Sequence, residues 1–427
     1  MSAAVPELLA PAGSAAGLAA ALHAGADAVY FGVGNFNMRH KAKNFALGEL
    51  ANVVSLCREH GARAYLALNT IIYERELKAL ETVVEAARAA GVDAVIGWDA
   101  AVIQAVLSRG MELHLSTQAS VSNSKAIAAC YRQYGIRRFV MARECSLNDL
   151  TLIRRNLATE LGTEADSIEF EIFIHGAMCV SLSGRCFLSQ SVSGHSANRG
   201  ICLQPCRREY RIIDTEGEYE FTIGKDYVLS PKDLCTMPFF DKVMLSNVAS
   251  LKIEGRARGP EYVSTVTSAY RRAIDAWRER PQSTETDPAE FPAAYEELKT
   301  RLTAKLRTVF NRDFHAGFYM GKPAADWVGK PGSQARYRKE SVGKVVNYFR
   351  KPQAAEVIIQ NRGIQRGDTL LFQGITTGSL EVQANQIRVN DKPAEQALRG
   401  ESASIHTGAP VRRGDLVYRA VENYHDG

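Results

Sequence analysis

The chain has 427 residues, of which 46% are hydrophobic and 23% are charged, and its formal net charge is +5 at neutral pH. These values are typical of a globular protein of two or three domains. The sequence also excludes a membrane-spanning helix, because no apolar run approaches the roughly 18 residues that such a helix needs. The opening M-S-A-A-V-P-E-L-L-A lacks the basic and apolar regions of a signal peptide. We therefore expect a cytoplasmic protein that contacts no membrane and whose cysteines stay reduced.

One phrase recurs through the first 280 residues: a helical segment ends in glycine, and a short run rich in Val, Ile, Leu and Tyr follows. Examples are H-A-G-A-D-A-V-Y-F-G at 23–32 and A-G-V-D-A-V-I-G-W-D at 90–99. Glycine caps the helix, and an apolar run without alternation indicates a strand of a parallel sheet buried on both faces. The predicted strands are 7–10, 28–33, 62–68, 94–98, 112–117, 138–142, 168–174 and 250–254.

Eight such β/α units in about 280 residues match a TIM-like (β/α)8 barrel. A doubly wound open sheet is the alternative. However, the first strand runs into L-A-P-A-G at 9–13, which is a tight turn and not a dinucleotide-binding G-x-G-x-x-G. We predict an α/β barrel over 1–280 that carries a cysteine-rich insertion over 176–235.

The rest of the chain has a different composition. Residues 281–294 are typical of a surface linker, and a helical stretch over 295–308 leads into a basic region, where 301–350 holds 11 Lys or Arg against three acids. From about Val342 short alternating runs such as V-G-K-V-V and A-E-V-I-I indicate strands. We predict a linker and basic helical connector over 281–340 and a small all-β barrel over 341–427.

Five of the eight cysteines lie close together in the sequence, at Cys179, Cys186, Cys202, Cys206 and Cys235. Structural zinc sites use C-x2-4-C pairs, and only Cys202 and Cys206 have that spacing. A 4Fe–4S cluster takes four thiolates and tolerates irregular spacing when the loops between them are long. Spacing alone leaves an iron–sulfur cluster, zinc and redox or structural thiols open.

Polar side chains follow most of the predicted strands, at the end where the active sites of barrel enzymes form. They are Arg39, Asn69, Gln118, Arg143, Glu144, His175, Lys252, Glu254 and Arg256. The cations among them would form an electropositive pocket for a carboxylate or phosphate. We assign catalytic roles to His175, Arg143, Glu144, Lys252, Glu254 and Arg256, and substrate binding to Arg39, Asn69 and Gln118.

The run Glu171-x-Phe173-x-x-Gly176-Ala177-Met178-Cys179-x4-Gly184-x-Cys186-x-Leu188-Ser189 resembles the signature of peptidase family U32. The phrases E-L-L-A-P-A-G and S-L-K-I-E-G-R are similar to the family's other motifs. The resemblance implies an oxygen-independent hydroxylation protein with a 4Fe–4S cluster, like the family members that act on tRNA wobble uridine, 23S rRNA or ubiquinone. It also implies the ligands Cys179, Cys186, Cys202 and Cys235, with Cys206 as a spare that could replace Cys202. For the tRNA members it implies prephenate, a small dicarboxylate, as the oxygen donor.

The C-terminal phrases V-G-K-V-V and R-G-D-T-L-L-F resemble the second domain of elongation-factor Tu-like proteins. Together with the basic connector they favour RNA, and tRNA in particular, over a lipid quinone. We expect Arg336, Arg338 and Lys339 to bind RNA, and the protein to support hydroxylation of the tRNA wobble uridine. The alternatives are rRNA or quinone hydroxylation, a non-catalytic RNA-binding protein with a structural cluster, and a collagenase-like peptidase. The chain contains no H-E-x-x-H and no G-x-S-x-G motif, which counts against the peptidase.

Overall fold

The computed structural model describes residues 5–34, 36–39, 43–208, 211–213, 220–222, 227–279, 293–321, 327–328 and 332–423. Most of the predicted linker, residues 281–292, therefore lies outside the described residues. In the described part of the chain, no helix is both long and apolar enough to cross a bilayer.

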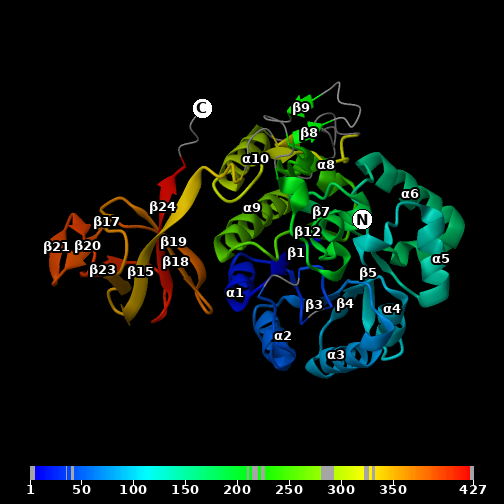
Figure 1. Cartoon of the computed structure of the whole chain (residues 1–427), viewed down its shortest axis with the longest axis horizontal. Coiled ribbons are helices and arrows are strands. Elements are labelled where there is room, and N and C mark those ends of the chain that lie inside the picture. The colour runs from blue at the N-terminus through cyan, green and yellow to red at the C-terminus, as the bar shows by residue number, and fades with distance from the viewer. Residues whose placement is uncertain are drawn as a thin grey trace.

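Eight parallel strands close into a barrel (Figure 1). They are β1 (Glu7–Ala12), β2 (Ala28–Phe31), β3 (Arg63–Leu68), β4 (Ala94–Gly97), β5 (Glu112–Leu115), β6 (Arg138–Val140), β7 (Glu169–Ala177) and β12 (Ser250–Ile253). Strand β12 pairs with both β1 and β7, which completes the ring. The predicted (β/α)8 barrel is confirmed, and each predicted strand overlaps one of these eight.

Helices cover the outside of this barrel. They are α1 (Ala15–His23), α2 (Leu50–Glu59), α3 (Leu77–Ala90), α4 (Ala100–Leu107), α5 (Ser124–Tyr134), α6 (Leu147–Leu161), α8 (Phe240–Leu245) and α9 (Pro260–Glu279). Local signals set their ends. Asp99 and Asn123 cap α4 and α5 by accepting a backbone hydrogen bond, and Gly91 and Gly135 end α3 and α5 in the left-handed conformation.

The barrel interior is charged, whereas the layer between strands and helices is apolar. Arg138 on β6 donates to Glu7 on β1 at 2.8 Å and to Glu169 on β7 at 2.6 Å. Because β1 and β6 are not neighbours in the ring, the contact between them crosses the interior. Nearer the carboxyl ends, Lys252 on β12 donates to Glu171 on β7 at 2.7 Å. The interior therefore places ionisable side chains under the mouth of the barrel.

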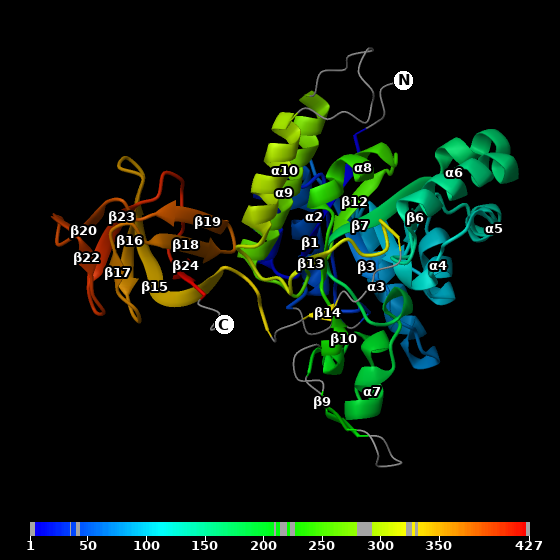
Figure 2. The same ribbon diagram turned by 90° about the horizontal axis from the view of Figure 1, so that it is seen from above.

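The chain leaves the barrel after β7 and returns beside it. The returning strand β11 (Asp233–Cys235) pairs antiparallel with β7, with Ala177 opposite Asp233 and His175 opposite Cys235. Between them lie α7 (Leu188–Ser193), β8 (Arg211–Ile213), β9 (Glu220–Thr222) and β10 (Tyr227–Pro231). We call residues 178–232 the insertion. Figure 2 shows α7 and β9 projecting from the barrel.

After the barrel comes α10 (Ala293–Leu306), the only part of the predicted connector that is helical among the described residues. Strands β13 (Phe314–His315) and β14 (Trp327–Val328) pair with β11 and β10.

An antiparallel all-β domain follows, and this prediction is confirmed. Its eight-stranded sheet runs in the order β19 (Gly378–Gln383), β18 (Thr369–Gly374), β24 (Leu416–Glu422), β15 (Tyr337–Phe349), β16 (Ala354–Ile359), β23 (Ser402–His406), β20 (Ile387–Val389) and β21 (Lys392–Ala394). The short strands β17 (Ile364–Gln365) and β22 (Gln396–Ala397) form a separate pair.

The all-β domain has its own apolar core, which includes Val357, Phe372 and Ile405. It lies beside α1 and α9, away from the insertion (Figure 1). Two of its side chains bind the first turn of α9: Lys339 pairs with Glu261 at 3.0 Å, and Gln373 donates to Glu261 at 3.0 Å. The domain is thus fixed to the outer wall of the barrel by polar contacts and close packing.

Candidate functional site

A cavity of about 440 Å³ lies at the carboxyl ends of the barrel strands, between the barrel and the insertion. One wall carries predicted strand-end residues and the other carries predicted cysteines. The predicted site residues that line it are Arg39, Asn69, Gln118, Arg143, Cys179, Cys186, Cys202, Lys252, Glu254 and Arg256. Cys206 lines it too. The structure thus brings most of the predicted site together in one place.

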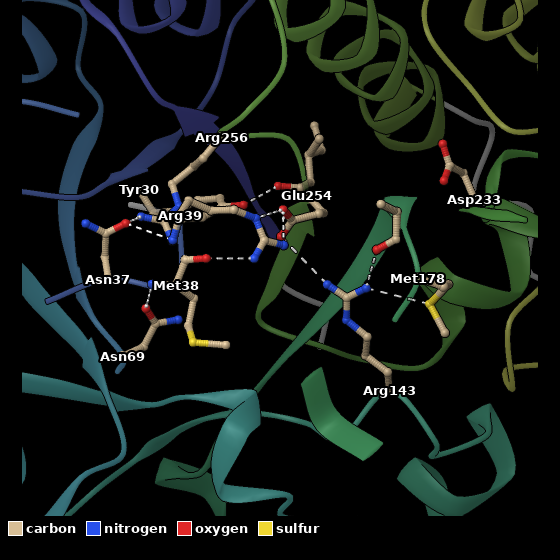
Figure 3. A network of polar contacts seen from close by, with 12 residues as sticks. Tyr30, Asn37, Met38, Arg39, Asn69, Arg143, Met178, Asp233, Glu254 and Arg256 are labelled. Atoms are coloured by element: carbon tan, nitrogen blue, oxygen red, sulfur yellow. Dashed lines mark hydrogen bonds and ion pairs between the residues drawn. The ribbon is translucent and has the colours of Figure 1, made fainter. Parts of the chain in front are cut away.

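Glu254 is the shared partner of two arginines (Figure 3). Its Oε1 accepts hydrogen bonds from Arg39 Nη2 at 2.8 Å and Arg39 Nε at 3.2 Å, and its Oε2 lies 3.7 Å from Arg143 Nη2. Burial alone would raise the pKa of Glu254, but Arg39, Arg143 and Arg256 together lower it to about 2. Glu254 therefore stays ionised at neutral pH and serves as a counter-ion, not as a proton donor.

Arg143 and Arg256 occupy opposite sides of this carboxylate (Figure 3). Arg143 donates to the carbonyl of Ala177 at 2.8 Å, and its guanidinium lies 3.7 Å from the centre of the Phe173 ring. Arg256 is buried, and burial lowers its pKa to about 10, so it remains charged at neutral pH. In the described part of the chain no carboxylate forms an ion pair with Arg256.

Lys252 lies at the floor of the cavity. It is buried and pairs with Glu171, which is completely buried beneath it. Burial would raise the pKa of Glu171, but Lys252 holds it below its ordinary value. The four predicted cations (Arg39, Arg143, Lys252 and Arg256) therefore face two carboxylates (Glu171 and Glu254), which leaves two net positive charges. The predicted electropositive pocket exists, with half of its charge compensated internally.

Asn37 is a site residue that sequence reasoning missed. It is completely buried, and its Oδ1 accepts hydrogen bonds from Arg256 Nη1 and from the backbone N–H of Arg39, both at 3.0 Å. The side-chain amide of Asn69 holds the same loop, because Asn69 Oδ1 accepts a hydrogen bond from the backbone N–H of Met38 at 3.1 Å. The signal was present: an asparagine two residues before Arg39 has the spacing of an Asx-turn.

Glu144 does not line the cavity. Its carboxylate accepts a hydrogen bond from the backbone N–H of Ser183 at 2.8 Å and one from the Ser183 hydroxyl at 3.3 Å. Ser183 has a φ of 46°, a conformation that costs a non-glycine residue free energy. Glu144 therefore holds the first loop of the insertion in place, and we assign it no catalytic role.

His175 lies on the other side of the sheet from the cavity. The register between β7 and β12 shifts after Phe173, so that His175 pairs with Ile253 and points outward with it. Its ring is buried among Tyr262, Tyr270 and Phe314. Burial lowers the pKa of His175 to about 3, so it is neutral at physiological pH. We therefore correct the expectation that it faces the site.

Four thiols surround one side of the cavity: Cys179, Cys186, Cys202 and Cys206. The four thiols are close enough to affect one another's ionisation. The pKa of Cys206 is raised: burial is the largest cause, Arg207 acts in the opposite direction, and the other three cysteines raise the pKa further.

The fifth cysteine of the predicted set, Cys235, is buried on β11 and does not line the cavity. Its Sγ lies 3.9 Å from the Tyr270 hydroxyl, and burial raises its pKa to about 11. The fourth thiol that the structure offers to a cavity ligand is thus Cys206.

The four cavity thiols match the number and type of ligands that a 4Fe–4S cluster takes. Among the described residues no three His, Cys, Asp or Glu converge closely enough to hold one metal ion. A 4Fe–4S cluster instead binds four thiolates around a larger body. Backbone N–H groups already point at two of the sulfurs, from Ser181 to Cys179 at 3.5 Å and from Leu188 to Cys186 at 3.3 Å. Hydrogen bonds of this kind tune the potential of such clusters.

The predicted RNA-binding residues lie outside the cavity, on and beside β15. Each pairs with a carboxylate: Arg336 with Glu422 at 3.0 Å, Arg338 with Glu340 at 2.9 Å, and Lys339 with Glu261 at 3.0 Å. Their charge is therefore largely neutralised locally.

Comparison with known proteins decides the family. The model of peptidase family U32 matches residues 13–329, which include every barrel strand except β1, the insertion and α10. The chain belongs to peptidase family U32.

Relatives within this U32 family carry different names. A protein of Porphyromonas gingivalis named "Collagenase" is 38% identical over 97% of both chains. A "tRNA hydroxylation protein P1" of Bacillus subtilis is 35% identical over 86% of this chain and 83% of its own. A 23S rRNA 5-hydroxycytidine synthase of Escherichia coli is 36% identical over 63% of this chain and 39% of its own. The U32 family resemblance expected from the cysteine motif is confirmed.

Proposed function

We propose that this U32 protein supports the oxygen-independent hydroxylation of a base in RNA, and that the base is the wobble uridine of tRNA. The names of the Bacillus subtilis and Escherichia coli relatives support RNA hydroxylation. The observation that carries the proposal is the single cavity in which a net positive barrel mouth faces four thiols. Neither wall alone would serve this chemistry, because one offers charge and the other offers metal ligands.

The cysteine wall would hold a 4Fe–4S cluster through Cys179, Cys186, Cys202 and Cys206. A bound cluster would supply one-electron redox chemistry to the cavity. The protein would keep the thiols close together by tying their loops to the barrel, for example through Glu144 and Ser183. This choice of fourth ligand differs from the one implied by family resemblance, and Cys235 is its direct competitor.

The barrel wall would bind a small anionic co-substrate such as prephenate. Arg256 has no carboxylate partner among the described residues. Arg143 Nη2 lies 3.7 Å from Glu254 Oε2, which is longer than a hydrogen bond, so Arg143 can still bind a ligand carboxylate. Charge-assisted hydrogen bonds from two guanidinium groups suit a dicarboxylate. Glu254 would fix the orientation of the arginines, and Asn37 would fix Arg256 from behind.

A peptidase is the competing function, because one relative is named as a collagenase. A cysteine peptidase needs a histidine beside its thiol. Among the described residues, none that lines the cavity is a histidine, and His175 lies behind the sheet. The geometry therefore favours hydroxylation.

The test is mass spectrometry of nucleosides from tRNA and from rRNA of a strain that lacks the gene. We expect 5-hydroxyuridine-type modification of tRNA to disappear, and to return with the wild-type gene but not with Arg256→Met. Loss in rRNA alone would transfer the activity to rRNA. Unchanged modification in both RNAs, in a strain without a second family member, would contradict the proposal, and digestion of collagen by the purified protein would then favour the peptidase.

A further inference from the structure

The part of the insertion that carries the cavity thiols, residues 178–208, contains no aspartate and no glutamate. At the chain's average of 47 acids in 427 residues, this segment would hold about three. It does contain four arginines: Arg185, Arg199, Arg207 and Arg208. We call it the acid-free segment. Arg199 pairs with Glu76 on the facing barrel loop, whereas no carboxylate pairs with Arg185 among the described residues.

The acid-free segment also exposes large apolar side chains. Phe187 is 72% exposed, Leu182 is 60% exposed and Val192 is 54% exposed. In the sequence Phe187 stands between Cys186 and Leu188, both of which line the cavity. Several large apolar side chains exposed within one short segment are typical of a binding surface.

The barrel loops facing this segment add aromatic rings paired with arginines. The guanidinium of Arg185 lies 5.7 Å from the centre of the Trp98 ring, and Arg185 also donates to Ser120 at 2.9 Å. The guanidinium of Arg199 lies 4.6 Å from the ring of Tyr73, which is 42% exposed. Trp98 and Tyr73 follow β4 and β3, at the carboxyl end of the barrel where the cavity lies.

We propose that the acid-free segment and these two barrel loops form the RNA-docking surface, and that an unpaired stretch of RNA lies there with a base stacked on Phe187. This inference rests on the proposed function and adds the form of the substrate to it. An exposed arginine that no carboxylate engages, such as Arg185, suits a phosphate. Exposed aromatic rings bind bases only where the bases are unpaired, and a base inside a duplex cannot enter a cavity.

The RNA-docking surface replaces the one expected from sequence. Arg336 and Arg338 are each engaged with a carboxylate on the all-β domain, whereas no carboxylate pairs with Arg185 in the described part of the chain. Aromatic rings and arginines also occur in protein–protein interfaces. The absence of Asp and Glu from residues 178–208 is the feature that favours nucleic acid.

The experiment measures binding of the full-length protein to a synthetic RNA hairpin with an unpaired uridine loop, by fluorescence anisotropy. The same stem closed into a continuous duplex is the second probe. Phe187→Ala should weaken hairpin binding by about 5- to 100-fold, the range for loss of one base–aromatic stack, and leave duplex binding unchanged. Arg185→Glu should weaken binding of both probes and reduce its salt dependence.

Phe349→Ala is the matched control. Phe349 is 41% exposed, adjoins Arg350 and lies on β15, so it tests an aromatic in the basic region that sequence favoured. We expect this variant and Arg338→Glu to bind the hairpin as the wild type does.

Hairpin affinity unchanged in Phe187→Ala, or lost in Phe349→Ala or Arg338→Glu instead, would overturn the proposal. A change of oligomeric state in Phe187→Ala without a change in RNA affinity would make the surface an interface between copies of this chain and overturn it too. Binding is measured without turnover, so loss of the hairpin effect counts against the surface alone. If the purified protein binds the hairpin as expected but RNA modification is unchanged in the deletion strain, the result counts against the proposed function and not against the surface.

Discussion

The sequence predicts two cationic regions, the barrel mouth and the region around β15, and their charges differ in burial and in partners. At the barrel mouth, Arg39 and Arg143 share one carboxylate and Lys252 is buried on another. Around β15, Arg336 and Arg338 are 66% and 57% exposed; Arg336 pairs with Glu422, and Arg338 pairs with Glu340, which Arg419 also contacts. A count of lysines and arginines cannot separate the two regions, because burial determines what each charge does.

The energetic consequence follows from desolvation. A buried charge that loses its partner is strongly destabilising, because no water replaces the lost contact. An exposed pair contributes little, since water and salt take over when it breaks. The barrel mouth should therefore respond sharply to single substitutions, and the β15 region should hardly respond.

The largest effect should come from the cysteine wall. We expect Cys206→Ala to abolish the broad visible absorbance and the bound iron of anaerobically purified protein, because it removes one of four cavity thiolates. Cys235→Ala should retain both, since Cys235 is buried outside the cavity. The opposite pattern would restore the ligand set implied by family resemblance.

Next in size is the loss of the shared counter-ion. Glu254→Gln removes the carboxylate that Arg39 and Arg143 share and should destabilise the protein by about 3–5 kcal/mol in urea unfolding. A loss below about 1 kcal/mol would mean that the buried arginines find other partners.

The same carboxylate gives a pH dependence. Its pKa falls from an ordinary value of 4.5 to about 2 in the folded protein, so its stabilisation is present above pH 4.5. That stabilisation should disappear as the pH falls from 4.5 towards 2. Unfolding free energies of the wild type and Glu254→Gln should therefore converge in acid, and a constant difference down to pH 2 would contradict the assignment.

A smaller effect is expected where the two domains meet. Gly378 has a φ of +67°, and a Cβ there would lie 2.7 Å from the backbone nitrogen of Ala20 in α1. Gly400→Ala is the control, with a φ of +93° and no atom within 4 Å of the added Cβ. Gly378→Ala should cost about 1–3 kcal/mol more than the control, because only it forces the backbones of two domains apart. Equal losses of stability in the two variants would show that the backbones at Gly378 and Ala20 can move apart without a cost in free energy.

The smallest effect should be at the surface of β15. Glu422→Gln breaks the pair with Arg336, whose side chain is 66% exposed. We expect its unfolding midpoint to match that of the wild type within measurement error, at low and at high salt. A salt-sensitive decrease would show that the β15 charges act as a network.

Local patterns predicted the parts of the fold that local forces determine. Glycine caps and doubly buried strands located all eight barrel strands, because capping and burial act within a few residues. The prediction that side chains at strand ends meet was also correct for Arg39, Arg143, Lys252 and Arg256, which line one cavity.

Long-range features escaped prediction. One residue of register shift between β7 and β12 turns His175 outward, and such a bulge depends on the partner strand. The choice between Cys206 and Cys235 depends on which loop reaches the cavity. The role of Glu144 depends on a contact with Ser183, 39 residues away in the sequence. None of these is visible in spacing.

The return of the chain beside β7 has a consequence for how such a protein is assembled and diversified. The insertion is flanked by two paired residues, Ala177 and Asp233, while β12 completes the ring on β7 itself. The barrel can therefore close before any cysteine loop is ordered. Loop-closure entropy grows only slowly with length, so the insertion can be lengthened, shortened or exchanged at little expense to the scaffold. Chemistry and substrate choice are thereby free to evolve on a fold that does not have to change with them.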